Sequence, residues 1–338
     1  MLKNCHGYTF CAVAVMTIVF AAQPVGAEER FRLDDGQWKA QARIDPASAE
    51  GQLQTIRKTL AQGQAKIAYK AIDQWIEDHS NHDLLVEAYL IRGDTWVTRR
   101  RYFKALFDYE YVVRMYPASE QFITACDREY EIAKIFASGM KRVWLGMRVL
   151  PAAGEAEELY IRIQERLPGS DLGEKASLSL GDFYFDRREM TSASAAYDLF
   201  LQNYPHSEYR ERAMLRLIHA SLATFKGSQF DSTGLIDAQV RINQFEAEYP
   251  ASAERIGVDS LKSKINELLA LKHEQIGSWY QRQGNRVSAS YMYQRVIKDY
   301  SDTAAAQAAA NQLHTNQQRQ AAPDQGQDAA EQSPENAS

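Results

Sequence analysis

Small and large apolar side chains recur along this chain at fixed spacings, separated by polar stretches. In five copies a Pro or Ser closes the pattern, the twelfth residue before it is Ala, and the eighth is large and apolar. Three copies extend upstream to a Gly, 24 residues before the closing position, with an aromatic residue three after it. The copies are Gly93, Trp96, Ala105, Tyr109 and Pro117; Ala156, Tyr160 and Pro168; Gly181, Tyr184, Ala193, Tyr197 and Pro205; Ala238, Ile242 and Pro250; Gly277, Tyr280, Ala289, Tyr293 and Ser301; and a degenerate earlier copy, Ala68, Ile72 and Ser80.

This spacing predicts one pair of antiparallel helices per copy. Gly and Ala would let the two helices approach closely, and the aromatic side chains would fill the space around them. Proline cannot continue a helix, so the closing Pro should end the second helix of the pair. The pattern resembles the tetratricopeptide repeat, whose period is about 34 residues. We therefore predict an all-α tetratricopeptide-repeat superhelix, an α-solenoid of about five to six helix pairs, with these signature residues in packing roles.

Successive closing positions lie 37 to 51 residues apart, so some copies contain extra residues. Between Pro117 and Pro168, the breakers Gly139 and 151–154 predict a long first helix and a loose connection. Residues 226–234 read as a loop. Apolar positions from Val258 to Tyr280 have helical spacing and predict one extended helix.

The two ends of the chain differ from the repeats. Lys3 precedes an apolar run at 11–22, which is shorter than the roughly 20 residues of a membrane-spanning helix. Small residues follow near a cleavage point, so we expect residues 1–27 to be a cleaved secretory signal peptide. The expected order is then a lead-in at 28–50, the repeat domain at 51–313 and a disordered Gln/Ala/Pro tail at 314–338, which has almost no apolar residue larger than Ala.

Cysteine usage bears on disulfides and on lipid attachment. Cleavage would remove Cys5 and Cys11 and leave Cys126, which cannot form an internal disulfide alone. We interpret Cys126 as a small buried apolar residue of a helix. Cys11 follows Phe10, whereas lipid attachment to a cysteine needs a small residue before it, so lipoprotein processing is not expected. Membrane association would then be indirect, through a partner.

Composition and charge exclude several classes of function. With 45% hydrophobic and 25% charged residues, the chain has the composition of a folded soluble protein. A net charge of −5 disfavours nucleic acid as a partner and an electrostatic membrane-binding surface. The sequence contains no phosphate-binding Gly-rich loop, no Gly-x-Ser-x-Gly and no His-Glu-x-x-His. We predict no catalytic, metal or cofactor residue, and a protein that is not an enzyme.

Two polar clusters have alternative interpretations. Residues 78–83 contain two histidines between carboxylates, at a spacing that zinc sites can use, although a solvated turn between repeats is favoured. Residues 99–101 are three arginines followed by Lys104, and Arg187-Arg188 occupies the same register two copies later. The recurrence favours solvated helix ends, with binding of an anionic partner as the alternative.

Four aromatic residues fall outside the repeat signature and are candidates for a peptide groove: Tyr89, Phe107, Tyr111 and Tyr130. Solenoids bind extended peptides or helices in the long groove that stacked units create.

A secreted chain of long repeat units that end in Tyr-Pro-x-Ser, as at 116–119, 204–207 and 249–252, resembles the BamD family of the outer-membrane β-barrel assembly machinery. The likeness covers roughly residues 50–313. It includes the elongated third unit around residues 130–134 and Gly139. It implies a non-enzymatic scaffold in the periplasm, at the inner face of the outer membrane. The resemblance further implies that the units ending at Ser80, Pro117 and Pro168 receive unfolded barrel precursors, and that residues 197–293 dock on the barrel-forming assembly protein.

Two alternatives remain open. A cell-division accessory protein of the Tol-Pal system also ends in such repeats, but that family typically begins with a coiled coil, and residues 28–50 lack sustained heptads. A peptidoglycan-processing enzyme with a helical solenoid would need a catalytic domain, and the repeats leave no room for one.

Overall fold

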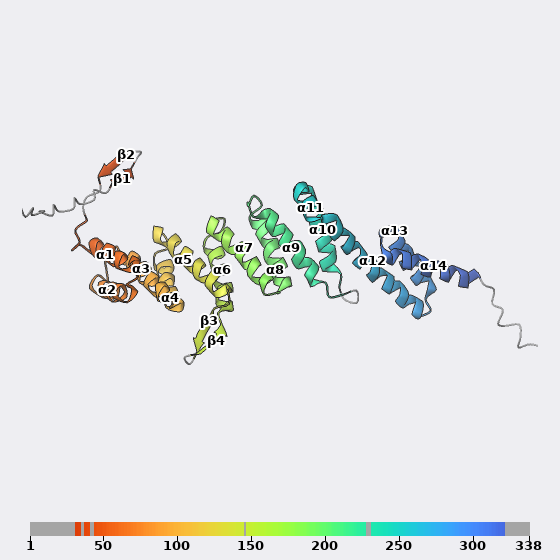
Figure 1. The fold of residues 1–338 in the computed structure, drawn as a ribbon, viewed down its shortest axis with the longest axis horizontal. Coiled ribbons are helices and arrows are strands. Elements are labelled where there is room, and N and C mark those ends of the chain that lie inside the picture. Colours follow the sequence, from red (N-terminus) through yellow and green to blue (C-terminus); the bar gives the residue numbers. More distant parts are fainter. Residues whose placement is uncertain (1–30, 35–36, 41–43, 145–146, 228–230, 322–338) are drawn as a thin grey trace, which may run out of the picture. The chain divides into compact units, whose positions relative to one another are not determined.

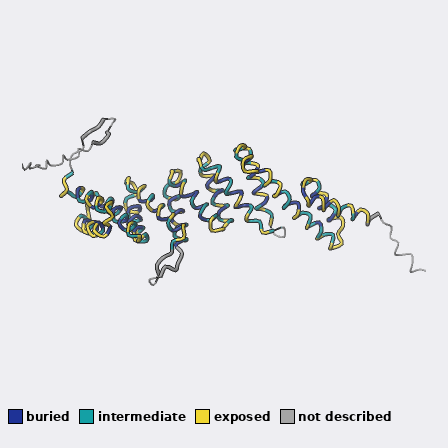
Figure 2. The backbone as a smooth tube through the Cα atoms, viewed as in Figure 1, coloured by how far each residue is buried: buried dark blue, intermediate teal, exposed yellow. Residues whose placement is uncertain are grey.

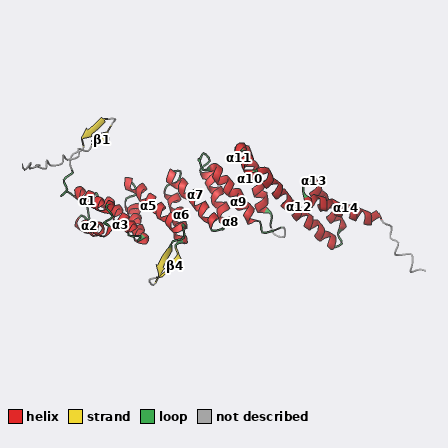
Figure 3. Cartoon of the chain, viewed as in Figure 1, coloured by secondary structure: helices red, strands yellow, loops and turns green. Residues whose placement is uncertain are grey.

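The computed structural model describes residues 31–34, 37–40, 44–144, 147–227 and 231–321. The predicted signal peptide and residues 322–338 of the predicted tail lie outside these ranges. The chain divides into two compact units, residues 1–84 and 85–338. Within the described residues there are helices throughout and two short hairpins (Figure 3), so the prediction of an all-α solenoid of helix pairs is confirmed.

The first unit contains a hairpin and one helix pair. Strands β1 (Phe31–Asp34) and β2 (Gln37–Ala40) pair antiparallel within the segment expected to be a lead-in. Helices α1 (Ala49–Ala61) and α2 (Ala65–Asp78) follow. Their buried side chains include Leu53, Ile72 and Trp75.

The second unit is a row of helix pairs followed by one last helix (Figure 1). The pairs are α3/α4, α5/α6, α7/α8, α9/α10 and α12/α13. The short β3–β4 hairpin is inserted between α5 and α6 of one pair, and helix α11 between the pairs α9/α10 and α12/α13. The bounds are α3 (Leu85–Thr98), α4 (Tyr102–Met115), α5 (Glu120–Ala137), β3 (Lys141–Trp144), β4 (Met147–Pro151), α6 (Ala153–Arg166), α7 (Asp171–Asp186), α8 (Met190–Asn203), α9 (Arg210–Thr224), α10 (Thr233–Glu248), α11 (Pro250–Ile256), α12 (Val258–Arg282), α13 (Arg286–Asp299) and α14 (Ala304–Ala321).

The Tyr-Pro-x-Ser motif both ends one helix and begins the next. Helix α4 ends one residue before Tyr116, and the Ser119 hydroxyl donates to the Tyr116 carbonyl over 2.8 Å just before α5 begins. In the next copy the Ser170 hydroxyl also accepts from the backbone N–H of Gly173, which caps α7. Ser48 caps α1 in the same way, so residues 45–48 are a further copy that the repeat analysis missed.

Three expectations about the irregular segments can be compared with the structure. Helix α12, with 25 residues, confirms the extended helix. The connection expected to be loose contains the β3–β4 hairpin, and Pro250 does not lead into a loop but occupies the first position of α11, where its missing N–H is tolerated. Helix α14 continues beyond residue 313 to Ala321, because Ala and Gln are good helix formers.

Close contact between the two helices of a pair depends on the signature Gly. A Cβ atom on Gly93, Gly181 or Gly277 would lie 2.3, 2.6 or 2.7 Å from a ring carbon of the tyrosine on the second helix. Those rings belong to Tyr109, Tyr197 and Tyr293, which are fully buried. The Tyr197 hydroxyl donates to Asp182 over 2.6 Å. Burial raises its pKa, so the phenol stays protonated as a donor.

The remaining signature residues divide by exposure, as Figure 2 shows along the helices. The signature alanines are fully buried, and they are Ala105, Ala156, Ala193, Ala238 and Ala289. Tyr160 is almost fully buried. The aromatic residues three after each Gly are half-buried, and they are Trp96, Tyr184 and Tyr280. The closing prolines are exposed at the helix junctions, and they are Pro117, Pro168, Pro205 and Pro250.

We predict that Gly181→Ala lowers the stability of the protein, because the added methyl group must displace the Tyr197 ring. Overpacking of this kind typically costs about 1–3 kcal/mol. Gly154 is the matched control, since a Cβ there meets nothing within 4 Å. In urea unfolding followed by circular dichroism, Gly181→Ala should lower the midpoint and Gly154→Ala should not. An unchanged midpoint for Gly181→Ala would contradict the packing argument.

Candidate functional site

The first helices of the four pairs from α3 to α10 form one continuous face of the second unit. Helix α3 contacts α5, α5 contacts α7, and α7 contacts α9, in addition to the contacts within each pair. Second helices of neighbouring pairs in residues 85–321 do not contact each other to a similar extent. The first helices therefore line the inner face of the stack, which is the face that solenoid proteins use for binding.

Two carboxylates on this face join one helix pair to the next. Asp94 accepts from the Tyr109 hydroxyl over 2.7 Å and from Arg128 of α5 over 3.1 Å. Asp182 does the same with Tyr197 and with an arginine of α9, Arg212. Each carboxylate thus links the two helices of its own pair to the first helix of the next pair.

The four groove candidates occupy three separate places. Tyr89 and Tyr111 stack with ring centroids 4.0 Å apart, and Arg92 lies over the Tyr89 ring. Tyr130 lies on α5, and its hydroxyl is 3.0 Å from the Ser179 hydroxyl of α7. Phe107 is 78% exposed on α4, a second helix. The structure brings Tyr89 and Tyr111 together, and joins neither to Phe107 nor to Tyr130.

Tyr130 lies beside a small pocket between α5, α6 and α7. The pocket has a volume of about 390 Å³ and is lined by residues that include Tyr160, Ser179 and Lys134. The Lys134 ammonium lies over the Tyr130 ring at 5.4 Å. Because its lining combines charged groups with aromatic rings, the pocket suits a single polar side chain of a partner.

A larger hollow lies between α7, α9 and the start of α12. Its volume is about 670 Å³, and its apolar lining consists of Phe185, Leu215, Ile256, Val258 and Leu261. The polar lining residues are Glu208, Glu211, Arg212, Arg216 and His219. We call this set of residues the α9–α12 groove.

The inserted helix α11 shapes one wall of the α9–α12 groove. Gly257 adopts a left-handed conformation with φ of 71°, which ends α11 and lets α12 begin in a new direction. Ile256, just before this turn, is left 45% exposed, whereas Val258 is buried. Sequence analysis missed this groove, although Pro250 followed by Gly257 is a recognisable signature of a short helix.

Arginine side chains add charge to the apolar floor of the α9–α12 groove. The Arg216 guanidinium lies over the Phe185 ring, 4.4 Å from its centroid. Burial and the nearby Arg216 lower the pKa of His219, so this imidazole is neutral near pH 7. An apolar floor with a few oriented charges is typical of sites that bind side chains of a protein partner.

A third hollow lies along the second half of α12. It has a volume of about 710 Å³, and its lining includes Lys272, Ile276, Trp279 and Arg282. Trp279 is 50% exposed. The first half of α12 is buried against α9 and α10, whereas the second half packs on α13 and α14, so this face of the long helix is left open.

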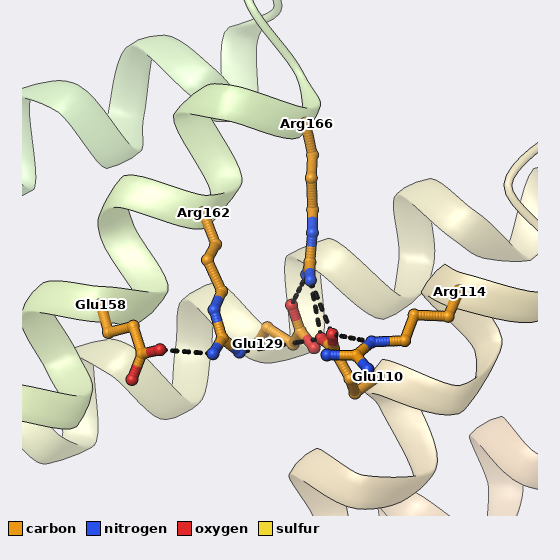
Figure 4. Close-up of polar contacts among 6 residues, drawn as sticks. All are labelled: Glu110, Arg114, Glu129, Glu158, Arg162 and Arg166. Atoms are coloured by element: carbon orange, nitrogen blue, oxygen red, sulfur yellow. Dashed lines mark hydrogen bonds and ion pairs between the residues drawn. The ribbon is translucent and has the colours of Figure 1, made fainter.

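A network of ionic groups joins α4, α5 and α6 (Figure 4). Arg166 donates to Glu129 over 2.8 Å and to both carboxylate oxygens of Glu110 over 2.7 and 2.9 Å. Arg114 also donates to Glu110, and Arg162 approaches it at 4.0 Å while pairing with Glu158. Glu129 is only 1% exposed, so burial disfavours the ionised form of its carboxyl group.

The pKa values of two carboxyl groups in this network, Glu129 and Glu110, are shifted in opposite directions. Burial, reinforced by the neighbouring charge of Glu110, raises the pKa of Glu129 to about 8, although Arg166 opposes the shift. Burial also acts on Glu110, but hydrogen bonds from Arg166 and Arg114 outweigh it and lower the pKa of that carboxyl. Sequence analysis missed this network, because Glu129 occupies a position that reads as an ordinary helix surface.

The described residues offer little reactive chemistry. Burial, followed by the charge of Glu129, raises the pKa of the Cys126 thiol to about 12, so the thiolate is not formed near neutral pH. Among the described residues, no three His, Cys, Asp or Glu side chains gather in a way that could hold a metal ion, and no helix is long and apolar enough to cross a membrane.

We predict that Glu129→Gln reduces the loss of stability between pH 5 and pH 8. A folded-state pKa of about 8 means that folded Glu129 keeps a proton which the unfolded chain releases above its ordinary pKa of 4.5. The contribution of this proton to stability is complete below pH 4.5 and is lost as the pH rises towards 8. Glutamine does not titrate, so the variant lacks this loss.

The measurement is the melting temperature of wild type and variant across this pH range. One kcal/mol corresponds to a shift of about 1–2 °C for a chain of this size. Glu158→Gln is the control, because Glu158 is an exposed carboxylate of the same network. Parallel pH profiles for wild type and Glu129→Gln would show that Glu129 is ionised throughout the range.

The fold is similar to those of solved tetratricopeptide-repeat proteins. A search of solved structures finds the C-terminal part of a tetratricopeptide-repeat protein from Cytophaga hutchinsonii, with 12% identity, 78% of this chain and 87% of that chain covered, and a TM-score of 0.39. A tetratricopeptide-repeat protein from Parabacteroides merdae has 12% identity and a TM-score of 0.37, and the match covers 80% of this chain and 98% of that chain. The type IV pilus biogenesis factor PilW has 13% identity and a TM-score of 0.31, and the match covers 78% of this chain and 98% of that chain.

No curated protein matches the sequence. A family model does match it: YfiO, described as an outer membrane lipoprotein, over residues 152–332. This match includes the α9–α12 groove and extends over more than half of the chain. The chain therefore belongs to the YfiO family of outer membrane lipoproteins.

Proposed function

We propose that this chain is a non-enzymatic periplasmic scaffold that binds protein partners during the assembly and insertion of outer-membrane β-barrel proteins. The observation that carries this proposal is the α9–α12 groove, which is open on the inner face and lies within the residues matched by the family. Export by the signal peptide and a position at the inner face of the outer membrane belong to the same proposal. Membership of an outer membrane family supports that location.

The α9–α12 groove suits an apolar side chain of a partner, flanked by polar contacts. Leu215 and Leu261 offer a half-buried floor, and Ile256 forms an exposed rim. Glu211 is already held by the Ser252 hydroxyl over 2.5 Å, which fixes one charge at the edge of the groove. Interfaces gain most of their affinity from a few such desolvated apolar anchors.

We assign two docking regions within this scaffold. The α9–α12 groove and the open face of α12 form the region for the barrel-forming assembly protein, in agreement with the resemblance at residues 197–293. The region for unfolded precursors consists of two separate contacts, one at Tyr89 and Tyr111 and one at Tyr130 with the small pocket beside it. Phe107 lies away from that face and would need a separate contact.

Cross-linking in intact cells tests the proposal directly. A photoreactive amino acid replaces Leu215 in the groove, and the same residue replaces the exposed Gln202 on α8 as the control. Recovery of a β-barrel assembly protein from position 215 alone would support the proposal. Recovery of Tol-Pal components or cell-wall enzymes instead would move the function to cell division or to the cell wall.

We predict that Ile256→Asp weakens binding of the partner by about 30-fold, since the loss of an interface anchor costs roughly 2 kcal/mol. Ile161→Asp is the matched control, because Ile161 has a similar exposure of 38% but lies on α6, a second helix. Co-purification from cells and melting temperature should be measured for both variants. Equal loss of the partner from both would contradict the assignment of the groove.

A further inference from the structure

The turns of the second unit fall on two opposite edges. Because the two helices of a pair run antiparallel, every turn inside a pair lies on one edge, and every turn between pairs lies on the other. The β3–β4 hairpin projects from the first edge and α11 lies at the second, as Figure 1 shows. We call the first the pair-turn edge.

The pair-turn edge carries an excess of positive charge. The turn from α3 to α4 is 99–101, three arginines, with Lys104 one turn further on. Arg187 and Arg188 form the turn from α7 to α8, where Asp186 and Glu189 balance their charges and Arg187 pairs with Glu189 over 2.8 Å. The opposite edge instead carries exposed carboxylates at each junction: Glu120, Asp171, Glu208, Glu254 and Asp302.

Backbone conformation gives a second observation. Arg100 and Arg188 have φ angles of 56° and 61°, in the left-handed region that disfavours side chains with a Cβ. The equivalent turns at Gly63 and Gly284 use glycine, with φ of 79° and 77°. Arginine at 100 and 188 therefore strains the backbone for no packing benefit, because both side chains are exposed. Strain that persists in this way often marks a functional residue.

The helix dipoles do not explain the basic edge. First helices end at this edge and second helices begin there, so their partial charges oppose each other. Arg101 is the N-cap residue of α4 and Arg286 is the first residue of α13, where positive charge is unfavourable. In the described chain, neither residue takes part in an ion pair. Their charges are therefore available to a group outside the chain.

Apolar groups accompany the cations at the pair-turn edge. Trp96 is half-buried and holds the Arg99 guanidinium and the Lys104 ammonium over its ring, each 4.6 Å from the centroid. Val287, next to Arg286, is 80% exposed. Cations mixed with Trp and aliphatic residues are typical of segments at a lipid interface.

We propose that the pair-turn edge docks on the anionic surface of a phospholipid bilayer. The cations form a row of separate exposed groups over several helix pairs, which matches an extended anionic surface better than a single ligand. The carboxylates of the opposite edge are repelled by that surface, so only one orientation is favoured. Membership of a family of outer membrane lipoproteins supports a position beside a bilayer, and the inference does not depend on which protein partner the scaffold binds.

The test measures binding of the full chain to vesicles of phosphatidylcholine and to equimolar vesicles of phosphatidylcholine and phosphatidylglycerol. Arg100→Gly/Arg188→Gly removes two cations at positions where glycine relieves the backbone, so the fold is retained. Each cation near an anionic surface contributes about 1 kcal/mol, so the variant should bind the anionic vesicles about 30-fold more weakly. Any contribution from the N-terminal segment is common to both proteins and leaves this ratio unchanged.

Two controls complete the experiment. Arg100→Lys/Arg188→Lys retains the charges and should bind as the wild type does. Arg255→Gln/Lys298→Gln removes two exposed cations from the opposite edge and should leave binding unchanged. Equal binding of wild type to both kinds of vesicle, or equal binding of wild type and the glycine variant, would overturn the proposal. Charge-dependent binding to polyglutamate without binding to anionic vesicles would also overturn it, in favour of an acidic protein partner.

Discussion

The second unit depends on the close approach of the two helices in each pair. At Gly181 the absence of a Cβ lets the Tyr197 ring lie directly against the first helix. This position brings the tyrosine hydroxyl to Asp182, and Asp182 in turn reaches Arg212 of the next pair. A single missing methyl group thus determines the geometry within a pair and also the contact between pairs. In the last pair the hydroxyl of the equivalent tyrosine, Tyr293, donates to the side-chain amide oxygen of Gln281, so an amide accepts the hydrogen bond in place of a carboxylate.

The repeat architecture could be predicted from sequence because its determinants are local. Ala193 and Tyr197 are separated by one helical turn, and Gly181 precedes them by a nearly constant interval, so packing constraints appear as fixed spacings. The same spacing placed Ala105 and Ala289 in the core, where both are fully buried. The Ser of Tyr-Pro-x-Ser turns and caps the chain within a few residues. The long helix α12 could also be predicted from the sequence, since its apolar positions repeat with a helical period.

The binding surfaces could not be predicted in the same way, because they arise where the repeat is interrupted. Phe185, Leu215 and Leu261 line one groove but are distant in sequence, and α11 is what brings the last of them to the others. Glu129 and Arg166 are separated by a helix junction, and only the fold shows that this carboxylate is buried. The aromatic residues outside the signature, such as Tyr89 and Phe107, recur at no fixed spacing. The sequence therefore could not show that they lie apart in the structure.

The distribution of charge shows why a net charge is a poor guide to binding. A value of −5 for the chain argued against an anionic partner, yet antiparallel pairs place alternate turns on opposite edges and so can separate the charges of one chain. Arg100 and Arg188 strengthen one edge at the expense of backbone strain. The α9–α12 groove opens on the inner face and reaches the edge opposite the pair-turn edge, where Glu208 and Ile256 lie. A scaffold built in this way can hold a protein on its inner face while an edge contacts a second, charged surface.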